Sequence, residues 1–228
     1  ATVRSIGRRR HGKDDFADDT VIVFTTFEEK RRGWHYAYRD EGVRHGGACQ
    51  PGMQLNLVDG CMFRCAYCGF GRYIIFNLDV EHFIDGLDAV FDQHPDQRLY
   101  KYSNVTDLPP FEPELNAIGP VSERFAREAD RYLMLFTKSD NIEFLRDVDH
   151  RGHTVVSWSL TCDSASKLID RRAATMHERI EAMVQAQSYG CPVRARLSPV
   201  VPVRNWQDEY TALFEALLAK VRPDVITL

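Results

Sequence analysis

The stretch "YLMLFTKSDNIEFLRDVDHRGHTVVSWSL", residues 132–160, decides the fold. It begins with an apolar run at 132–138 and ends with a second one, rich in β-branched residues, at 153–160. Between them, residues 141–149 follow helical spacing after an Asn that can cap a helix. Parallel strands are joined by such helical, right-handed crossovers. The stretch therefore predicts a strand–helix–strand unit of a parallel sheet.

The same alternation continues on both sides of this unit. Further strands are predicted at 53–58, 98–103, 192–201 and 224–228, and further helices at 79–94, 121–131, 171–190 and 205–221. Strands separated by helices are typical of a doubly wound sheet or of a full or partial β/α barrel. No helix follows the last strand, so we expect the natural protein to continue beyond Leu228.

Residues 1–52 have a different character from the alternating region at 53–228. They are polar and charged at the start, include a β-branched run at 20–26 that predicts an extra strand, and otherwise lack periodicity. We therefore expect an irregular N-terminal extension followed by one α/β domain. The basic stretches at 8–13 and 28–32 are typical of solvated arms.

Composition and charge exclude several classes of protein. A net charge of −4 and a pI near 6.1 disfavour a dedicated nucleic-acid binder. No apolar run is long enough to cross a bilayer, and no apolar signal segment opens the chain. Without an export signal, the six cysteines predict free thiols in a reducing, cytoplasmic compartment and not a disulfide framework.

Three of these cysteines, Cys61, Cys65 and Cys68, form a Cys-x3-Cys-x2-Cys motif directly after the strand predicted at 53–58. In parallel β/α folds the active site lies at this end of the strands. Structural zinc sites normally use four ligands, and the other cysteines are scattered. A three-cysteine site leaves one metal position open, and the open iron of an iron–sulfur cluster can bind a small molecule. A structural zinc site remains the alternative.

The spacing, with Tyr67 before the third cysteine, resembles the signature of the radical S-adenosylmethionine enzymes. The resemblance implies that the three cysteines hold a 4Fe–4S cluster and that S-adenosylmethionine binds its fourth iron. It also implies reductive cleavage of the cosubstrate to a 5′-deoxyadenosyl radical, which abstracts hydrogen from a substrate. An electron donor such as flavodoxin or ferredoxin would be needed.

Over residues 53–228 the chain resembles the spore photoproduct lyase family more narrowly. The similar stretches are "GCMFRCAYC", "YSNVTDL", "LFTKSDNIEFL", "VVSWSLTCD", "RIEAMVQAQSYGCPVRARLSPVVP" and "NWQDEYTALFEAL". With six alternating strands, we therefore expect a partial (β/α)6 barrel of parallel strands. For cosubstrate binding, the resemblance implies that Lys138 pairs with the carboxylate, that Thr106 and Ser159 form hydrogen bonds, that Ser198 contacts the adenine side through its backbone and that Tyr67 packs near the adenine.

Departures from the family pattern bear on the substrate. Asn104 in "SNVTD" stands where the family has a cysteine that returns a hydrogen atom to the product, and an amide cannot do this. Cys162, just past a strand end, is the spare thiol that we would test in that role. The family's DNA-binding hairpin lies beyond the matched part. We therefore predict a radical enzyme acting on a small-molecule or nucleotide-like substrate, with DNA photoproduct repair and a non-catalytic zinc module as the alternatives.

Overall fold

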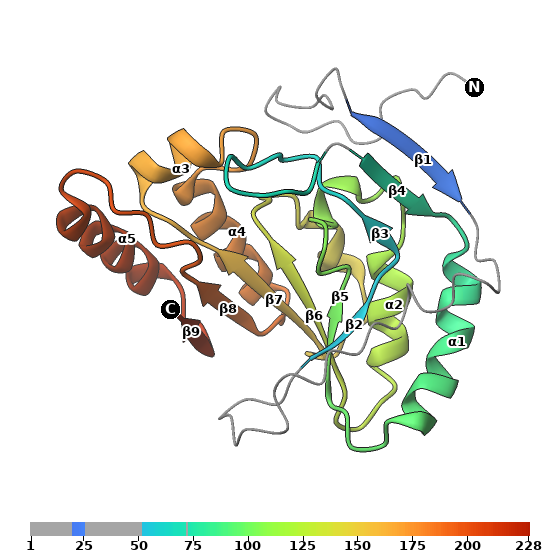
Figure 1. Cartoon of the computed structure of the whole chain (residues 1–228). Coiled ribbons are helices and arrows are strands. Elements are labelled where there is room, and N and C mark those ends of the chain that lie inside the picture. The colour runs from blue at the N-terminus through green and yellow to red at the C-terminus, as the bar shows by residue number, and fades with distance from the viewer. Residues whose placement is uncertain (1–19, 26–51, 72) are drawn as a thin grey trace.

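A computed structural model describes residues 20–25, 52–71 and 73–228. Its main sheet contains six parallel strands that lie side by side in chain order (Figure 1). They are β2 (Met53–Leu55), β5 (Leu99–Tyr102), β6 (Tyr132–Thr137), β7 (Thr154–Ser159), β8 (Val193–Arg196) and β9 (Val225–Thr227). All five pairings are parallel, so the predicted partial barrel is confirmed.

The helices pack against one face of this sheet. They are α1 (Val80–Gln93), α2 (Ile118–Phe125), α3 (Asp163–Ile169), α4 (Met176–Ser188) and α5 (Trp206–Lys220), with 3-10 turns η3 (Pro109–Phe111) and η4 (Glu143–Asp147). Alternate strand residues point toward the helices and are fully buried, as period-2 geometry requires. Tyr100 and Tyr102 on β5, for example, contact Phe91 and Phe83 of α1. This layer forms the hydrophobic core.

Side chains fix the starts of several helices. The Asp79 carboxylate accepts a hydrogen bond from the His82 amide at the start of α1, and Thr175 and Glu178 form a reciprocal capping box at the start of α4. The α-helix predicted at 141–149 is wrong, because only the 3-10 turn η4 forms there. Asn141 does not cap a helix: its amide donates to the carbonyls of Pro109 and Glu112.

A second, three-stranded sheet lies at one edge of the molecule, in the order β1–β4–β3 (Figure 1). The strand expected at 20–26 is confirmed as β1 (Val21–Thr25), and it pairs in parallel with β4 (Tyr73–Asn77), which the sequence analysis missed. The strand predicted at 53–58 is divided between β2 and β3 (Val58–Asp59). The division occurs where the Ser103 hydroxyl accepts hydrogen bonds from the amides of Leu57 and Val58.

The predicted N-terminal extension is therefore joined to the domain through β1. The remainder of that extension, including the basic stretches at 8–13 and 28–32, lies outside the described residues. Among the residues that are described, no helix has the length and apolar character needed to cross a membrane.

Candidate metal centre and cosubstrate site

The cysteine loop lies at the carboxyl ends of the parallel strands, above the arrowhead of β6 in Figure 1. Backbone hydrogen bonds join it to two other segments: the Gly60 amide donates to the Val105 carbonyl at 3.3 Å, and the Ala66 amide to the Ile169 carbonyl of α3 at 2.8 Å. The loop is thus fixed between the turn that follows β5 and the end of α3.

A glycine is required where the chain enters the loop. Gly60 has a φ of +91°, and a Cβ built on it would lie 1.8 Å from the carbonyl oxygen of Tyr73. No side chain fits at that distance, and the backbone conformation itself is costly for any other residue. Tyr73 is the first residue of β4, and Cys61 follows Gly60 directly. The close approach of Gly60 to Tyr73 therefore sets the direction in which the chain runs from β3 to Cys61.

The three thiols differ in exposure. Cys65 is buried, Cys61 is half-buried and Cys68 is exposed. Burial, followed by the charge of Asp107, raises the pKa of Cys61. Burial also raises the pKa of Cys65 to about 12, although the ammonium of Lys138 opposes the shift. Both thiols are therefore protonated at neutral pH, and a metal that binds them must displace the protons.

Within the described ranges, no three His, Cys, Asp or Glu side chains converge closely enough to enclose a single metal ion.

Lys138 follows the last residue of β6, and its side chain lies beside the cysteine loop. Its Nζ is 3.8 Å from Cys65 Sγ and 4.7 Å from the centre of the Tyr67 ring, whose hydroxyl it also contacts. The same Nζ donates to both carboxylate oxygens of Asp170, at 2.7 and 2.8 Å. The structure thus brings together Lys138, Tyr67 and Cys65, which the sequence analysis had selected separately.

Asp170 and its second partner, Arg179, were missed by the sequence analysis. Arg179 on α4 is fully buried, and it donates to Asp170 Oδ2 at 3.1 Å and to the carbonyls of Ser159 and Ala174. Burial raises the pKa of Asp170, but the charges of Arg179 and Lys138 outweigh it and hold that pKa below its usual value. The sequence does contain a signal for Arg179. Helical periodicity places this arginine at a core position of α4, between Met176 and Met183.

Asp107 and Thr106 lie in the segment between β5 and η3. The Asp107 carboxylate accepts hydrogen bonds from the Thr137 hydroxyl at 2.7 Å and from the Lys138 amide at 2.6 Å, so it fixes the end of β6. The Thr106 hydroxyl oxygen is buried and has no hydrogen-bond partner among the described residues. Such an orphaned polar atom is what a bound ligand would satisfy.

The remaining predicted residues are placed as follows. Ser159 ends β7, and its carbonyl is held by Arg179. Ser198 is exposed beyond β8, and Asn104 is half-buried in the turn after β5. Cys162 is fully buried, and burial and the neighbouring Glu209 of α5 raise its pKa. Cys162 interacts with residues of α3 and α5.

A hollow of about 680 Å³ lies elsewhere, between η4 and the first turns of α4. Its lining includes Glu112, Asn141, Phe144, His177 and Glu181. None of the candidate site residues lines it, so it is separate from the cysteine loop.

A family model and two curated relatives match most of the chain. The family model described as spore photoproduct lyase matches residues 50–227. Spore photoproduct lyase from Bacillus subtilis is 27% identical over 178 residues, and that from Clostridium acetobutylicum is 24% identical over 176 residues. These matches cover 75% and 73% of the chain and 52% of each relative, so the chain spans about half the length of the curated relatives it matches.

Solved structures share the fold. A double mutant of spore photoproduct lyase with bound AdoMet and dinucleoside spore photoproduct has a TM-score of 0.74 at 17% identity. The enzyme complexed with dinucleoside spore photoproduct has a TM-score of 0.73 at 16% identity. Each match covers 96% of this chain and 63% of the other.

Proposed function

Because the chain belongs to the spore photoproduct lyase family, we propose that it is a radical S-adenosylmethionine enzyme in which Cys61, Cys65 and Cys68 hold a 4Fe–4S cluster. The observation that carries this proposal is the position of Lys138. An ammonium group lies against the cysteine loop, within 3.8 Å of one candidate ligand, where it can receive the carboxylate of the cosubstrate.

The residues present fit these groups. Three thiols on one backbone-anchored loop match the ligands that iron–sulfur clusters use, and the loop provides no fourth thiol, which leaves one iron for the cosubstrate. The buried Thr106 hydroxyl without a partner is available to a polar group of the ligand. Asp170 holds Lys138 in place before the ligand arrives.

When bound, the cluster supplies the electron that cleaves S-adenosylmethionine to methionine and a 5′-deoxyadenosyl radical, which abstracts a hydrogen atom from the substrate. The residues of this chain position the cosubstrate. Lys138 pairs with the carboxylate of the cosubstrate. Thr106 and Ser159 form hydrogen bonds to the cosubstrate, and Tyr67 packs against it. Beyond the end of β8, the backbone of Ser198 approaches the adenine side.

We infer that the substrate is a nucleotide-like molecule. Support comes from related structures that contain a dinucleoside spore photoproduct. Repair of DNA photoproducts is not favoured, because Asn104 cannot return a hydrogen atom to the product. Cys162 is the thiol that we would test in this role, and its burial against α5 requires local opening before it can act. A flavodoxin or a ferredoxin would supply the electron.

The test is formation of 5′-deoxyadenosine. The protein is purified without oxygen, supplied with iron and sulfide, reduced and mixed with S-adenosylmethionine. We expect the native protein to form deoxyadenosine and the Cys61→Ala/Cys65→Ala/Cys68→Ala variant to form none. Cys191→Ala, which removes a buried thiol beside His150, is the matched control and should keep the activity. A site that takes up zinc but never iron would contradict the proposal.

A further inference from the structure

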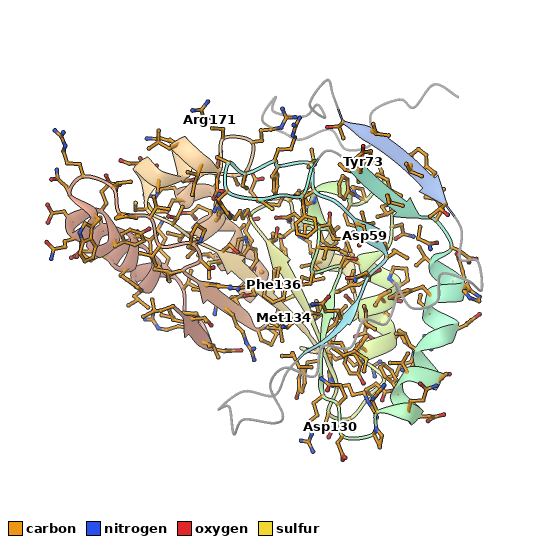
Figure 2. The ribbon with its side chains drawn as sticks, viewed as in Figure 1. Asp59, Tyr73, Asp130, Met134, Phe136 and Arg171 are labelled. Atoms are coloured by element: carbon orange, nitrogen blue, oxygen red, sulfur yellow. The ribbon has the colours of Figure 1, made fainter. Side chains whose placement is uncertain are left out.

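The face of the main sheet opposite the helices carries its own set of side chains. Strand register places Gln54, Lys101 and Met134 side by side on this concave face, and likewise Phe136, Ser157 and Arg194. Figure 2 labels Met134 and Phe136 along β6, with Phe136 nearer the cysteine loop. Arg196 lies beside Ser159 at the end of β8 nearest the loop. The concave face therefore continues directly into the candidate site.

Three cations occupy this face: Lys101, Arg194 and Arg196. None of the three forms an ion pair with another residue in the described part of the chain. The inward positions of β2, β5, β6, β7, β8 and β9 include no Asp or Glu. The face is thus positively charged within a protein whose net charge is −4.

The two arginines reach across the sheet from β8. The Arg194 guanidinium lies 3.9 Å from the sulfur of Met134, and the Arg196 guanidinium lies 5.6 Å from the centre of the Phe136 ring. Both partners are on β6, so the arginine side chains pass over β7. The inward residues of β7 at these levels are Ser157 and Ser159. Their small side chains leave room for the two arginine side chains to cross β7.

The cations also share one space. The pKa of Lys101 is lowered first by burial and then by the charge of Arg196, although two strands, β6 and β7, lie between β5 and β8. The Arg194 Nε is buried and has no hydrogen-bond partner among the described residues. Like charges and an orphaned donor cost free energy in the protein alone, and a bound anion would offset that cost.

We propose that Lys101, Arg194 and Arg196 bind a phosphate group of the substrate on the concave face of the sheet. Guanidinium groups bind phosphate oxygens through paired N–H donors, and an ammonium adds a compact charge. The inference rests on the proposed function, which it deepens by assigning a phosphorylated nucleotide-like substrate. With the phosphate near Arg194 and Arg196, the rest of such a molecule would extend along β6 and β7 toward Lys138 and the cysteine loop.

Calorimetric titration with inorganic phosphate tests the proposal on the full chain, without reductant or S-adenosylmethionine. We expect phosphate to bind and thymidine 5′-monophosphate to bind more tightly than thymidine. Arg194→Gln and Arg196→Gln should each weaken phosphate binding about tenfold, the loss expected for one charge-assisted interaction. Arg151→Gln removes an exposed arginine that pairs with Asp149 and should leave the affinity unchanged.

Thermal denaturation shows whether the variants are folded. In phosphate-free buffer, Arg194→Gln should melt at or above the native temperature, because one of three clustered positive charges is gone. Phosphate should then raise the melting temperature of the native protein more than that of the variant. Equal phosphate affinity in native and Gln variants would overturn the proposal, as would displacement of phosphate by S-adenosylmethionine. Deoxyadenosine formation needs no phosphate, so a failure here is distinguishable from failure of the proposed function.

Discussion

Lys138 Nζ lies 2.7 Å from Asp170 Oδ1, and both side chains are buried under the cysteine loop. Arg179 contacts the other carboxylate oxygen. One carboxylate therefore pairs with two buried cations, Lys138 from the end of β6 and Arg179 from α4, and the three groups together carry one net positive charge. The pair joins the lysine proposed for cosubstrate binding to the hydrophobic core.

Asp170→Asn should destabilise the protein strongly. The amide keeps the shape but leaves Lys138 and Arg179 without a negative partner, and breaking a buried pair in this way costs roughly 3–5 kcal/mol. Chemical denaturation measures the change in free energy of unfolding. Asp163→Asn is the matched control, because Asp163 pairs with Lys167 at 2.6 Å on the surface, and it should have little effect. Equal effects of the two substitutions would show that burial of the Lys138 pair is unimportant.

Gly60→Ala should disrupt the entrance to the cysteine loop. The added Cβ would lie 1.8 Å from the Tyr73 carbonyl oxygen, so the backbone on one side must move, at a cost of about 1–3 kcal/mol. We expect a lower melting temperature and a lower iron content after reconstitution. Gly69→Ala changes the same loop at a position where a Cβ meets nothing within 4 Å. Equal melting temperatures and iron contents of the Gly60→Ala and Gly69→Ala variants would show that the contact of Gly60 with Tyr73 does not shape the loop.

Glu112→Ala should loosen the start of α2. Glu112 is buried, and one of its carboxylate oxygens accepts hydrogen bonds from the amides of Ala117 and Ile118, both at 2.8 Å. Removal leaves two buried donors without a partner, at about 1–3 kcal/mol each. Urea denaturation should show this loss, whereas Glu114→Ala, two residues away and exposed, should behave like the native protein. Similar midpoints for the two variants would exclude the capping role of Glu112.

The order of the main strands was predictable because apolar runs and helical periodicity alternate regularly along residues 53–228. The edge sheet was not, because the pairing of β1 with β4 joins segments about fifty residues apart, and periodicity carries no information on such contacts. The same limit explains the missed helix α3, whose seven residues are too few for a clear apolar stripe.

Part of the candidate site was equally predictable. The cysteine spacing selected the loop, and the resemblance to the spore photoproduct lyase family selected Lys138 and Ser159. The Asp170–Arg179 pair was missed because Asp170 lies in a charged stretch that is typical of a solvated loop. Only the tertiary fold buries it between β6 and α4. The three cations of the concave face lie on separate strands, and only strand register places them together.

Glu128 provides a prediction for pH dependence away from the candidate site. Its two carboxylate oxygens accept hydrogen bonds from Arg124 at 2.7 Å and Arg131 at 2.5 Å. Both guanidiniums also lie over the Phe91 ring. Burial raises the pKa of Glu128, but the two arginines outweigh it and hold that pKa below its usual value. Because the folded-state pKa is depressed, the stabilisation is complete above the unfolded-state pKa and is lost as pH falls through the folded-state value.

Glu128→Gln should therefore cost about 1 kcal/mol at pH 7, and the difference from the native protein should shrink below about pH 4.3, the usual pKa of a glutamate. Denaturation of both proteins at several pH values between 7 and 3 measures this difference. Glu123→Gln, on the exposed side of α2, is the control and should show a small difference at every pH. A Glu128→Gln difference that stays constant or grows on acidification would mean that the arginines do not depress the pKa of Glu128 in the folded protein.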